Sequence, residues 1–152
     1  MARYVVHVRT EMTPAEAFAY MSDLTNFAAW DPGVASVRQV EGDGAGPGAA
    51  FDVAVKLPVG TMTLRYDTIR FDDESTTMTA FAENALLTSE DTITVEPDGD
   101  GSIVTYDAVL RLKGPLGLSD PLLGVTFNQI GGRAAAGLVE ALAGERIAAP
   151  AA

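Results

Sequence analysis

The sequence contains no cysteine and a single histidine, and these scarcities exclude several kinds of chemistry. Without cysteine the chain can form no disulfide, no thiolate zinc site and no thiol nucleophile. His7 alone cannot supply a histidine metal cluster. We therefore expect no metal and no other cofactor, and we interpret His7 as a structural residue on a strand.

Long apolar runs and an excess of basic residues are missing as well. Residues 1–9 hold charges and lack the apolar run of a signal peptide, and no stretch is long enough to span a membrane. The chain has 10 Lys and Arg against 21 Asp and Glu, a net charge of −11. Phosphate backbones would repel such a protein. We expect a cytoplasmic protein with no membrane insertion and no nucleic-acid partner.

The composition is that of a globular protein with one sizeable core. The 152 residues are 47% hydrophobic and 20% charged, which argues against disorder. We find no linker and no repeat, so we predict one domain over residues 1–147 and a frayed tail over 148–152.

The only long helical pattern covers residues 119–144. Asp120 and Pro121 suit an N-cap and a first helical position, and Gly144 suits the C-terminal end. Apolar residues recur at spacings of three and four: Leu123, Phe127, Ile130, Ala134, Leu138 and Ala141. Gly131, Gly132 and Gly137 inside the pattern allow two readings, close packing on strands or a kink that makes the first half of the helix a lid.

The rest of the chain is mostly β in pattern. The first strand, residues 4–10, precedes a capping box, Thr13-Pro14-Ala15-Glu16, and two short helices that end near Trp30. Strands separated by short turns follow, and these predict antiparallel neighbours: residues 34–40, 51–57, 61–71, 76–83, 86–95 and 103–112. One long amphipathic helix after many strands needs a sheet to cover it, so the sheet should curl around the helix.

This order resembles the helix-grip superfamily of START, Bet v 1 and polyketide cyclase/dehydrase domains. The residues that carry the resemblance are Thr13–Phe18, Asn26–Trp30 and Gly114–Leu116. The resemblance covers nearly the whole chain and implies an α+β fold, with a curved antiparallel sheet of about seven strands around the long helix. It also implies an apolar cavity between them. Relatives bind sterols, lipids, polyketides or quinones, and a minority catalyse cyclisation and dehydration.

Three residues are candidates for catalysis. The resemblance places Tyr66 and Arg70 on the cavity face of their strand, where Arg70 could polarise a carbonyl. Arg70 could equally reach solvent and pair with Asp72 or Asp73. Asp91 shares the parity of Leu87, Ile93 and Val95, so it should point inward as a general base.

Seven further residues are candidates for ligand contact: Trp30, Phe51, Leu64, Phe81, Tyr106, Phe127 and Asn128. Trp30 could stack on a ligand ring or could plug the core. Buried tyrosines often satisfy their hydroxyl groups locally, and Asn128 could simply face water.

These residues support two functions of different classes. One is an enzyme that folds a polyketone and moves protons with Tyr66 or Asp91. The other is a non-catalytic carrier or sensor of an apolar molecule, such as a polyketide, a lipid or a steroid-like compound. A domain with a collapsed cavity that works through protein contacts is a third reading, and a homodimer is left open.

Overall fold

The computed structural model describes residues 1–115 and 120–149. Eight strands form one antiparallel sheet in the order β2-β3-β4-β5-β6-β7-β1-β8. The helices are α1 (Pro14–Ser22), the short 3-10 helix η1 (Leu24–Asn26), α2 (Phe27–Trp30) and α3 (Asp120–Ala141). The strands are β1 (Ala2–Thr10), β2 (Val34–Glu41), β3 (Ala50–Lys56), β4 (Thr61–Asp72), β5 (Thr77–Glu83), β6 (Leu87–Asp98), β7 (Gly101–Leu112) and β8 (Glu145–Ile147).

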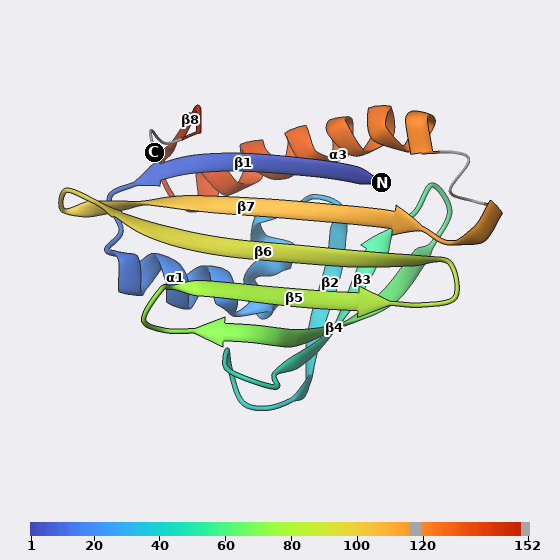
Figure 1. Cartoon of the computed structure of the whole chain (residues 1–152), viewed down its shortest axis with the longest axis horizontal. Coiled ribbons are helices and arrows are strands. Elements are labelled where there is room, and N and C mark those ends of the chain that lie inside the picture. The colour runs from blue at the N-terminus through green and yellow to red at the C-terminus, as the bar shows by residue number, and fades with distance from the viewer. Residues whose placement is uncertain (116–119, 150–152) are drawn as a thin grey trace.

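The sheet is strongly twisted, and the helices lie on its concave side. In Figure 1, β2 and β3 run steeply across the direction of β4 to β7, and α3 runs alongside β1. α3 packs against β1, β8 and α2. The predicted α+β helix-grip fold is therefore confirmed.

The strand count is one higher than the predicted number of about seven. The additional strand, β8, follows α3 and pairs with β1 through Arg9 opposite Glu145 and His7 opposite Ile147. Three residues are too few to show an alternating pattern, which is why the sequence did not predict this strand.

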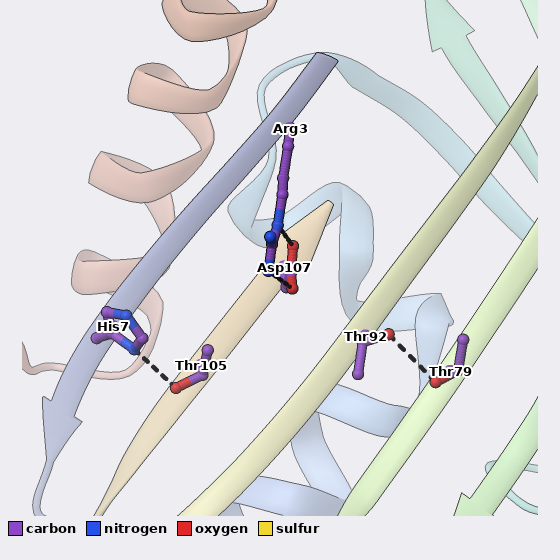
Figure 2. Close-up of polar contacts among 6 residues, drawn as sticks. All are labelled: Arg3, His7, Thr79, Thr92, Thr105 and Asp107. Carbon is purple, nitrogen blue, oxygen red and sulfur yellow. Dashed lines mark hydrogen bonds and ion pairs between the residues drawn. The ribbon is translucent and has the colours of Figure 1, made fainter. Parts of the chain in front are cut away.

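Alternation along the strands separates the core from the outer face. On β7, Val104, Tyr106 and Ala108 are buried, and β1 buries Val6 and Val8 in the same core. The intervening side chains carry the polar contacts of the outer face, which Figure 2 shows.

The outer face is stabilised by polar pairs across neighbouring strands. Arg3 on β1 makes a bidentate ion pair with Asp107 on β7, at 2.7 and 2.9 Å. His7 Nδ1 lies 2.8 Å from Thr105 Oγ1, and Thr79 Oγ1 lies 3.2 Å from Thr92 Oγ1 (Figure 2). His7 thus contacts a threonine on the outer face, away from the concave side.

The N-terminal end of α1 is built as the sequence predicts. The Thr13 hydroxyl accepts a hydrogen bond from the Glu16 backbone N–H, and the Glu16 carboxylate accepts one from the Thr13 backbone N–H. This capping box satisfies two N–H groups that have no partner within the helix.

Two of the α3 glycines allow close packing. A Cβ at Gly131 would collide with the Tyr4 ring of β1, and a Cβ at Gly137 would collide with the Trp30 backbone carbonyl. A Cβ at Gly132 would meet open space. α3 continues as one helix through these positions, which favours the packing reading over the kink.

The C-terminal end of α3 differs in one detail from the prediction. The left-handed position is occupied by Ala143, with φ of 48°, and not by a glycine. Ala143 N–H donates to Glu140 O and Gly144 N–H donates to Val139 O, the pattern of a Schellman motif. Gly144 is required for another reason, because a Cβ there would collide with the Arg9 backbone carbonyl.

Candidate functional site

A cavity of about 290 Å³ lies on the concave side, between the sheet and helices α2 and α3. Its walls are mostly aliphatic and aromatic, with contributions from β3, β4, β6 and β7. The apolar lining is Phe27, Val34, Val53, Val55, Leu57, Met62, Leu64, Leu87, Ala108, Leu110, Leu112, Phe127 and Ile130. A curved sheet and a single helix leave such a space because they cannot interdigitate over their whole surfaces.

A cluster of four hydrogen-bonded side chains forms the polar end of this cavity. Tyr66 on β4, Ser89 and Asp91 on β6, and Tyr106 on β7 all point inward. Tyr106 OH donates to Asp91 Oδ2 at 2.7 Å, and the Tyr66 and Ser89 hydroxyls lie 2.8 Å apart. Ser89 Oγ makes a longer contact of 3.5 Å to Asp91 Oδ1. We call these four residues the polar cluster.

Burial dominates the electrostatics of the polar cluster. Removal from water raises the pKa of Asp91 to about 7, against the lowering effect of the hydrogen bonds from Tyr106 and Ser89. Burial, followed by the nearby Asp91 charge, also raises the pKa of Tyr66 and of Tyr106. Asp91 can therefore exchange a proton near neutral pH, whereas both phenols keep theirs.

A second carboxylate, Asp31, lies in the cavity wall directly after α2. Burial raises its pKa, while the hydrogen bond from Gly33 N–H, at 2.8 Å, and the charge of Lys56 act in the opposite direction. The Asp31 charge also raises the pKa of Asp91. The two acids therefore belong to one electrostatic site.

The short helix α2 holds the polar cluster in place through aromatic packing. The Trp30 ring is stacked on Phe27, with centroids 4.8 Å apart, and meets the Tyr106 ring edge-on at 5.1 Å. Trp30 is only 3% exposed and does not line the cavity. Of its two predicted roles, the structure therefore favours the core plug, and Trp30 positions Tyr106.

The cavity opens between the β3–β4 turn and α3. Lys56 and Leu57 at the end of β3 are exposed, and so is Ile130 on α3. All three also line the cavity. A ligand can therefore enter at this end and place its far end against Asp91.

The structure brings five of the predicted residues together around the cavity: Tyr66, Asp91, Leu64, Tyr106 and Phe127. Asp91 points inward, as its parity on the strand predicts. The contribution of each residue to binding or catalysis remains a prediction.

Arg70 lies outside the cavity and is exposed to solvent beside Asp72, which is the second of its two predicted positions and excludes the inward one. A β-bulge interrupts the β4–β5 pairing between Thr68 and Arg70. The bulge leaves both Ile69 and Arg70 exposed and returns Phe71 to the inner side. Hydrogen bonds from Ser75 and Glu74 lower the pKa of Asp72, and the Arg70 charge adds a smaller lowering effect, so Arg70 interacts at the surface.

Three of the ligand-contact candidates also lie outside the cavity lining, and for Asn128 this agrees with the alternative that it faces water. Phe81 alternates with the inward Ala80 and Ala82, so it lies on the outer face of β5. Asn128 on α3 is exposed, because it lies between the inward Phe127 and solvent-facing residues. Phe51 is fully buried in the core but does not line the cavity.

Sequence reasoning missed several residues of the cavity lining, among them Ser89 and Asp31, which interact with Asp91. Ser89 shares the inward parity of Leu87 and Asp91, so the alternation of β6 contained the signal. Asp31 lies in a turn, Trp30-Asp31-Pro32-Gly33, and carries no such pattern. Only the packing of α2 against the sheet brings its carboxylate near Asp91.

Two further properties concern metals and membranes. In the part of the chain that the structure describes, no three His, Asp or Glu side chains are grouped as metal ligands would be. None of the helices in the described ranges combines the length and the hydropathy that crossing a membrane requires.

The chain is similar in sequence to one family and in structure to several solved proteins. Residues 1–145 match the family described as polyketide cyclase/dehydrase and lipid transport. A comparison with curated proteins gave no significant match.

Three solved structures illustrate the likeness in fold. A protein of Thermus thermophilus has a TM-score of 0.74 at 18% identity, with 93% of this chain and 96% of that one covered. A START superfamily protein of Mycobacterium smegmatis has a TM-score of 0.74 at 12% identity, with 94% of this chain and 98% of that chain covered. The protein Ara h 8.0201 has a TM-score of 0.58 at 19% identity, with 91% of this chain and 97% of that chain covered. At these identities the likeness establishes the fold alone.

Proposed function

Because the chain belongs to the polyketide cyclase/dehydrase and lipid-transport family, we propose that it binds an apolar small molecule in the cavity beneath α3. The observation that carries this proposal is the combination of apolar walls with one buried polar cluster. Pockets for small ligands are built in this way, with few polar groups that fix orientation. A volume of about 290 Å³ also weighs against a collapsed cavity that acts only through protein contacts.

Native mass spectrometry followed by a thermal-shift screen tests this proposal. We expect either a co-purifying apolar compound or a rise in melting temperature with neutral aromatic and aliphatic compounds. A ligand that binds only the folded state at a hundred times its Kd stabilises by about 2.7 kcal/mol, which such a screen detects.

A pair of neighbouring variants locates the binding. Ala108→Leu adds bulk inside the cavity, opposite Asp91 in the β6–β7 register, whereas Val109→Leu adds bulk on the outer face. The rise in melting temperature on adding ligand should vanish in folded Ala108→Leu and persist in Val109→Leu. Equal shifts in both variants would place the binding elsewhere.

Proton-transfer catalysis is a second candidate function, and the position of Asp91 favours it. A carboxyl with a pKa of about 7 at the polar end of an apolar cavity suits a general base that later acts as an acid. In an aldol cyclisation of a polyketone, Asp91 would take a proton from the carbon between two carbonyls. The enolate carbon would then attack a ketone carbon, and Asp91 would return the proton to the resulting alkoxide before water is lost.

Asp91→Asn tests this second candidate. General-base catalysis contributes roughly 10²–10⁴-fold, so the variant should lose about that factor in the rate of aromatic product formation, followed by absorbance. Asp67→Asn removes the same charge from the exposed face of β4 and should keep the full rate. Equal rates in both variants and the wild type would remove Asp91 from the reaction.

A further inference from the structure

The buried and part-buried charged residues of the cavity are both acidic. Asp91 is buried at the polar end and Asp31 is part-buried in the wall. Among the described lining residues the one basic side chain is Lys56, which is exposed at the opening and already faces Asp31. The arginines are all exposed and lie outside the lining, and residues 116–125 contain no Lys, Arg or His.

This arrangement is unfavourable for an acidic ligand. A carboxylate placed at the polar end would meet Asp91 with no cation to neutralise either group. Repulsion between like charges is strong in a site from which water is excluded. A fatty acid or an aromatic acid would therefore lose affinity by entering head first.

The hydrogen-bond directions in the polar cluster add a second restriction. Tyr106 donates its proton to Asp91 Oδ2, and Ser89 donates towards Asp91 Oδ1. A serine hydroxyl has one proton, so Tyr66 then donates to Ser89 across their 2.8 Å contact. In this arrangement two hydroxyl protons point towards Asp91 and that of Tyr66 points towards Ser89, so all three are used within the polar cluster. Lone pairs of the phenol oxygens and of the carboxylate are left to face a ligand, so the polar end offers acceptors.

The cavity volume limits the size of the ligand. At about 290 Å³ the cavity lies at the lower end of the range for pockets that bind small ligands, roughly 300–1,000 Å³. This suits a compact compound with one or two rings. A sterol or a long acyl chain would have to extend out of the opening.

We infer that the ligand is a compact apolar compound that ends in a hydroxyl or amino group, and that the cavity discriminates against carboxylates. The donor group would lie against Tyr66, Asp91 and Tyr106, with the ring system among the aliphatic walls. This inference rests on the proposed function, since it names the chemical class that the same cavity accepts.

Equilibrium dialysis with four naphthalene derivatives tests the inference on the wild-type protein. The set is 2-methylnaphthalene, 2-naphthol, 2-naphthylmethylamine and 2-naphthoate, which share one ring system and differ in the polar group. Measurements at pH 8, above the pKa of Asp91 of about 7, keep its carboxylate ionised. We expect the alcohol and the amine to bind at least tenfold more tightly than the acid, and more tightly than the hydrocarbon.

The possible results separate the inference from the proposed function. Binding of naphthoate as tight as that of the alcohol and the amine would overturn the inference and leave a ligand-binding cavity. The same holds if the hydrocarbon binds as tightly as both donors. Failure of all four compounds to bind would contradict the inference and the proposed function together.

Two variants assign the selectivity to Asp91. Asp91→Asn should reduce the ratio of amine to acid affinity by at least tenfold, because it removes the buried charge and introduces N–H donors. Asp67→Asn has the same effect on net charge at an exposed site and should leave the ratio unchanged. If Asp91→Asn does not fold, Tyr106→Phe serves instead, and it should weaken the alcohol more than the hydrocarbon. An unchanged ratio in folded Asp91→Asn, or equal weakening of both compounds in Tyr106→Phe, would overturn the assignment.

Discussion

At the scale of single residues, Asp91 is the buried acid of the cavity lining. It is 5% exposed, and its carboxylate oxygens accept hydrogen bonds from Tyr106 and, more weakly, from Ser89. A buried acid of this kind reduces stability when it is charged, unless a cation lies beside it. Its protonation therefore links folding to pH.

The first prediction concerns this linkage. The folded-state pKa of about 7 lies above the ordinary value of 3.8, so the folded protein holds the Asp91 proton more tightly than the unfolded chain does. The stabilisation is fully present below pH 3.8 and is lost as the pH rises to about 7. Within this window the free energy of unfolding should fall by about 1.4 kcal/mol per pH unit from this group.

Urea denaturation of the wild type and of Asp91→Asn at pH 5 and pH 8 measures this effect. The free energy of unfolding of Asp91→Asn should rise relative to that of the wild type between pH 5 and pH 8, because the asparagine amide does not ionise. Asp67→Asn is the control for net charge, and its difference from the wild type should stay nearly constant. If Asp91→Asn and Asp67→Asn change in parallel, Asp91 is not the titrating group.

The second prediction, also at the residue scale, concerns Arg70. Because its side chain is exposed beyond the β-bulge, Arg70→Ala should change stability by no more than about 0.5 kcal/mol. Binding of any ligand in the cavity should be unchanged. A large loss of ligand affinity in a variant with an unchanged melting temperature would show that Arg70 reaches the cavity in solution.

At the scale of elements, α3 depends on a few small residues that set its distance from its neighbours. Gly131 faces the Tyr4 ring, whereas its neighbour Gly132 faces open space. These two adjacent glycines differ only in what lies opposite them, so they form a matched pair.

The third prediction follows from this pair. Gly132→Ala should stabilise the protein by up to about 1 kcal/mol, the difference in helix propensity between the two residues. Gly131→Ala should destabilise it by about 1–3 kcal/mol, because α3 or the Tyr4 ring must move. Thermal or urea unfolding of both variants decides the point, and equal effects would indicate that α3 is not tightly packed on β1.

The fourth prediction concerns the end of the same helix. Ala143 adopts a left-handed conformation that an alanine side chain disfavours by roughly 1–2 kcal/mol. Ala143→Gly should therefore raise the free energy of unfolding by up to about that amount, reduced by the greater freedom of glycine in the unfolded chain. Gly144→Ala should lower it, since the new Cβ would meet the Arg9 carbonyl. Opposite signs at these neighbouring positions are the expected result.

Some features of the helices and strands could be predicted from the sequence and others could not. Alternation in β3, β6 and β7 predicted the inner faces, and the capping box at Thr13 predicted the start of α1. The bulge in β4 was missed, although the apolar residues change from even positions such as Leu64 and Tyr66 to odd positions at Ile69 and Phe71. Only the pairing with β5 shows where the extra residue lies.

The same reasoning explains the mixed outcome at the site. Tyr66, Asp91 and Tyr106 lie on regular strand segments, so their parity predicted their direction. The prediction that Phe81 faces the cavity was wrong. Phe81 alternates with Ala80 and Ala82 along β5, and the two alanines face inward. Asp31 could not be predicted, because its place in the site depends on how α2 packs on the sheet, and no local pattern specifies that packing.

At the scale of the whole molecule, the excess of negative charge is the dominant electrostatic feature. The net charge is −11, and the excess negative side chains repel one another in the compact folded state. The ion pairs of the surface, such as Arg9 with Glu145 and Lys113 with Glu83, join exposed or part-exposed side chains. Pairs of this type contribute about 0–1 kcal/mol each.

The fifth prediction follows from this balance. Raising the salt concentration from 0.01 to 0.1 M shortens the screening length from about 30 to about 10 Å, which weakens repulsion across the molecule more than contacts within a pair. The melting temperature at pH 8 should therefore rise with NaCl. A fall would mean that the individual ion pairs outweigh the net charge.

The order of strands in the sheet determines when each part of the protein can fold. β2 to β7 pair with their neighbours in sequence, so these hairpins can form while the chain is being synthesised. β1 must wait, because its partners are β7 and β8, and Ala2 pairs with Leu110. Contacts between such distant residues slow folding, since a long loop must close first. β1 is thus synthesised before β2 to β7 but is among the last strands to join the sheet. Its apolar side chains stay uncovered until the later strands are complete.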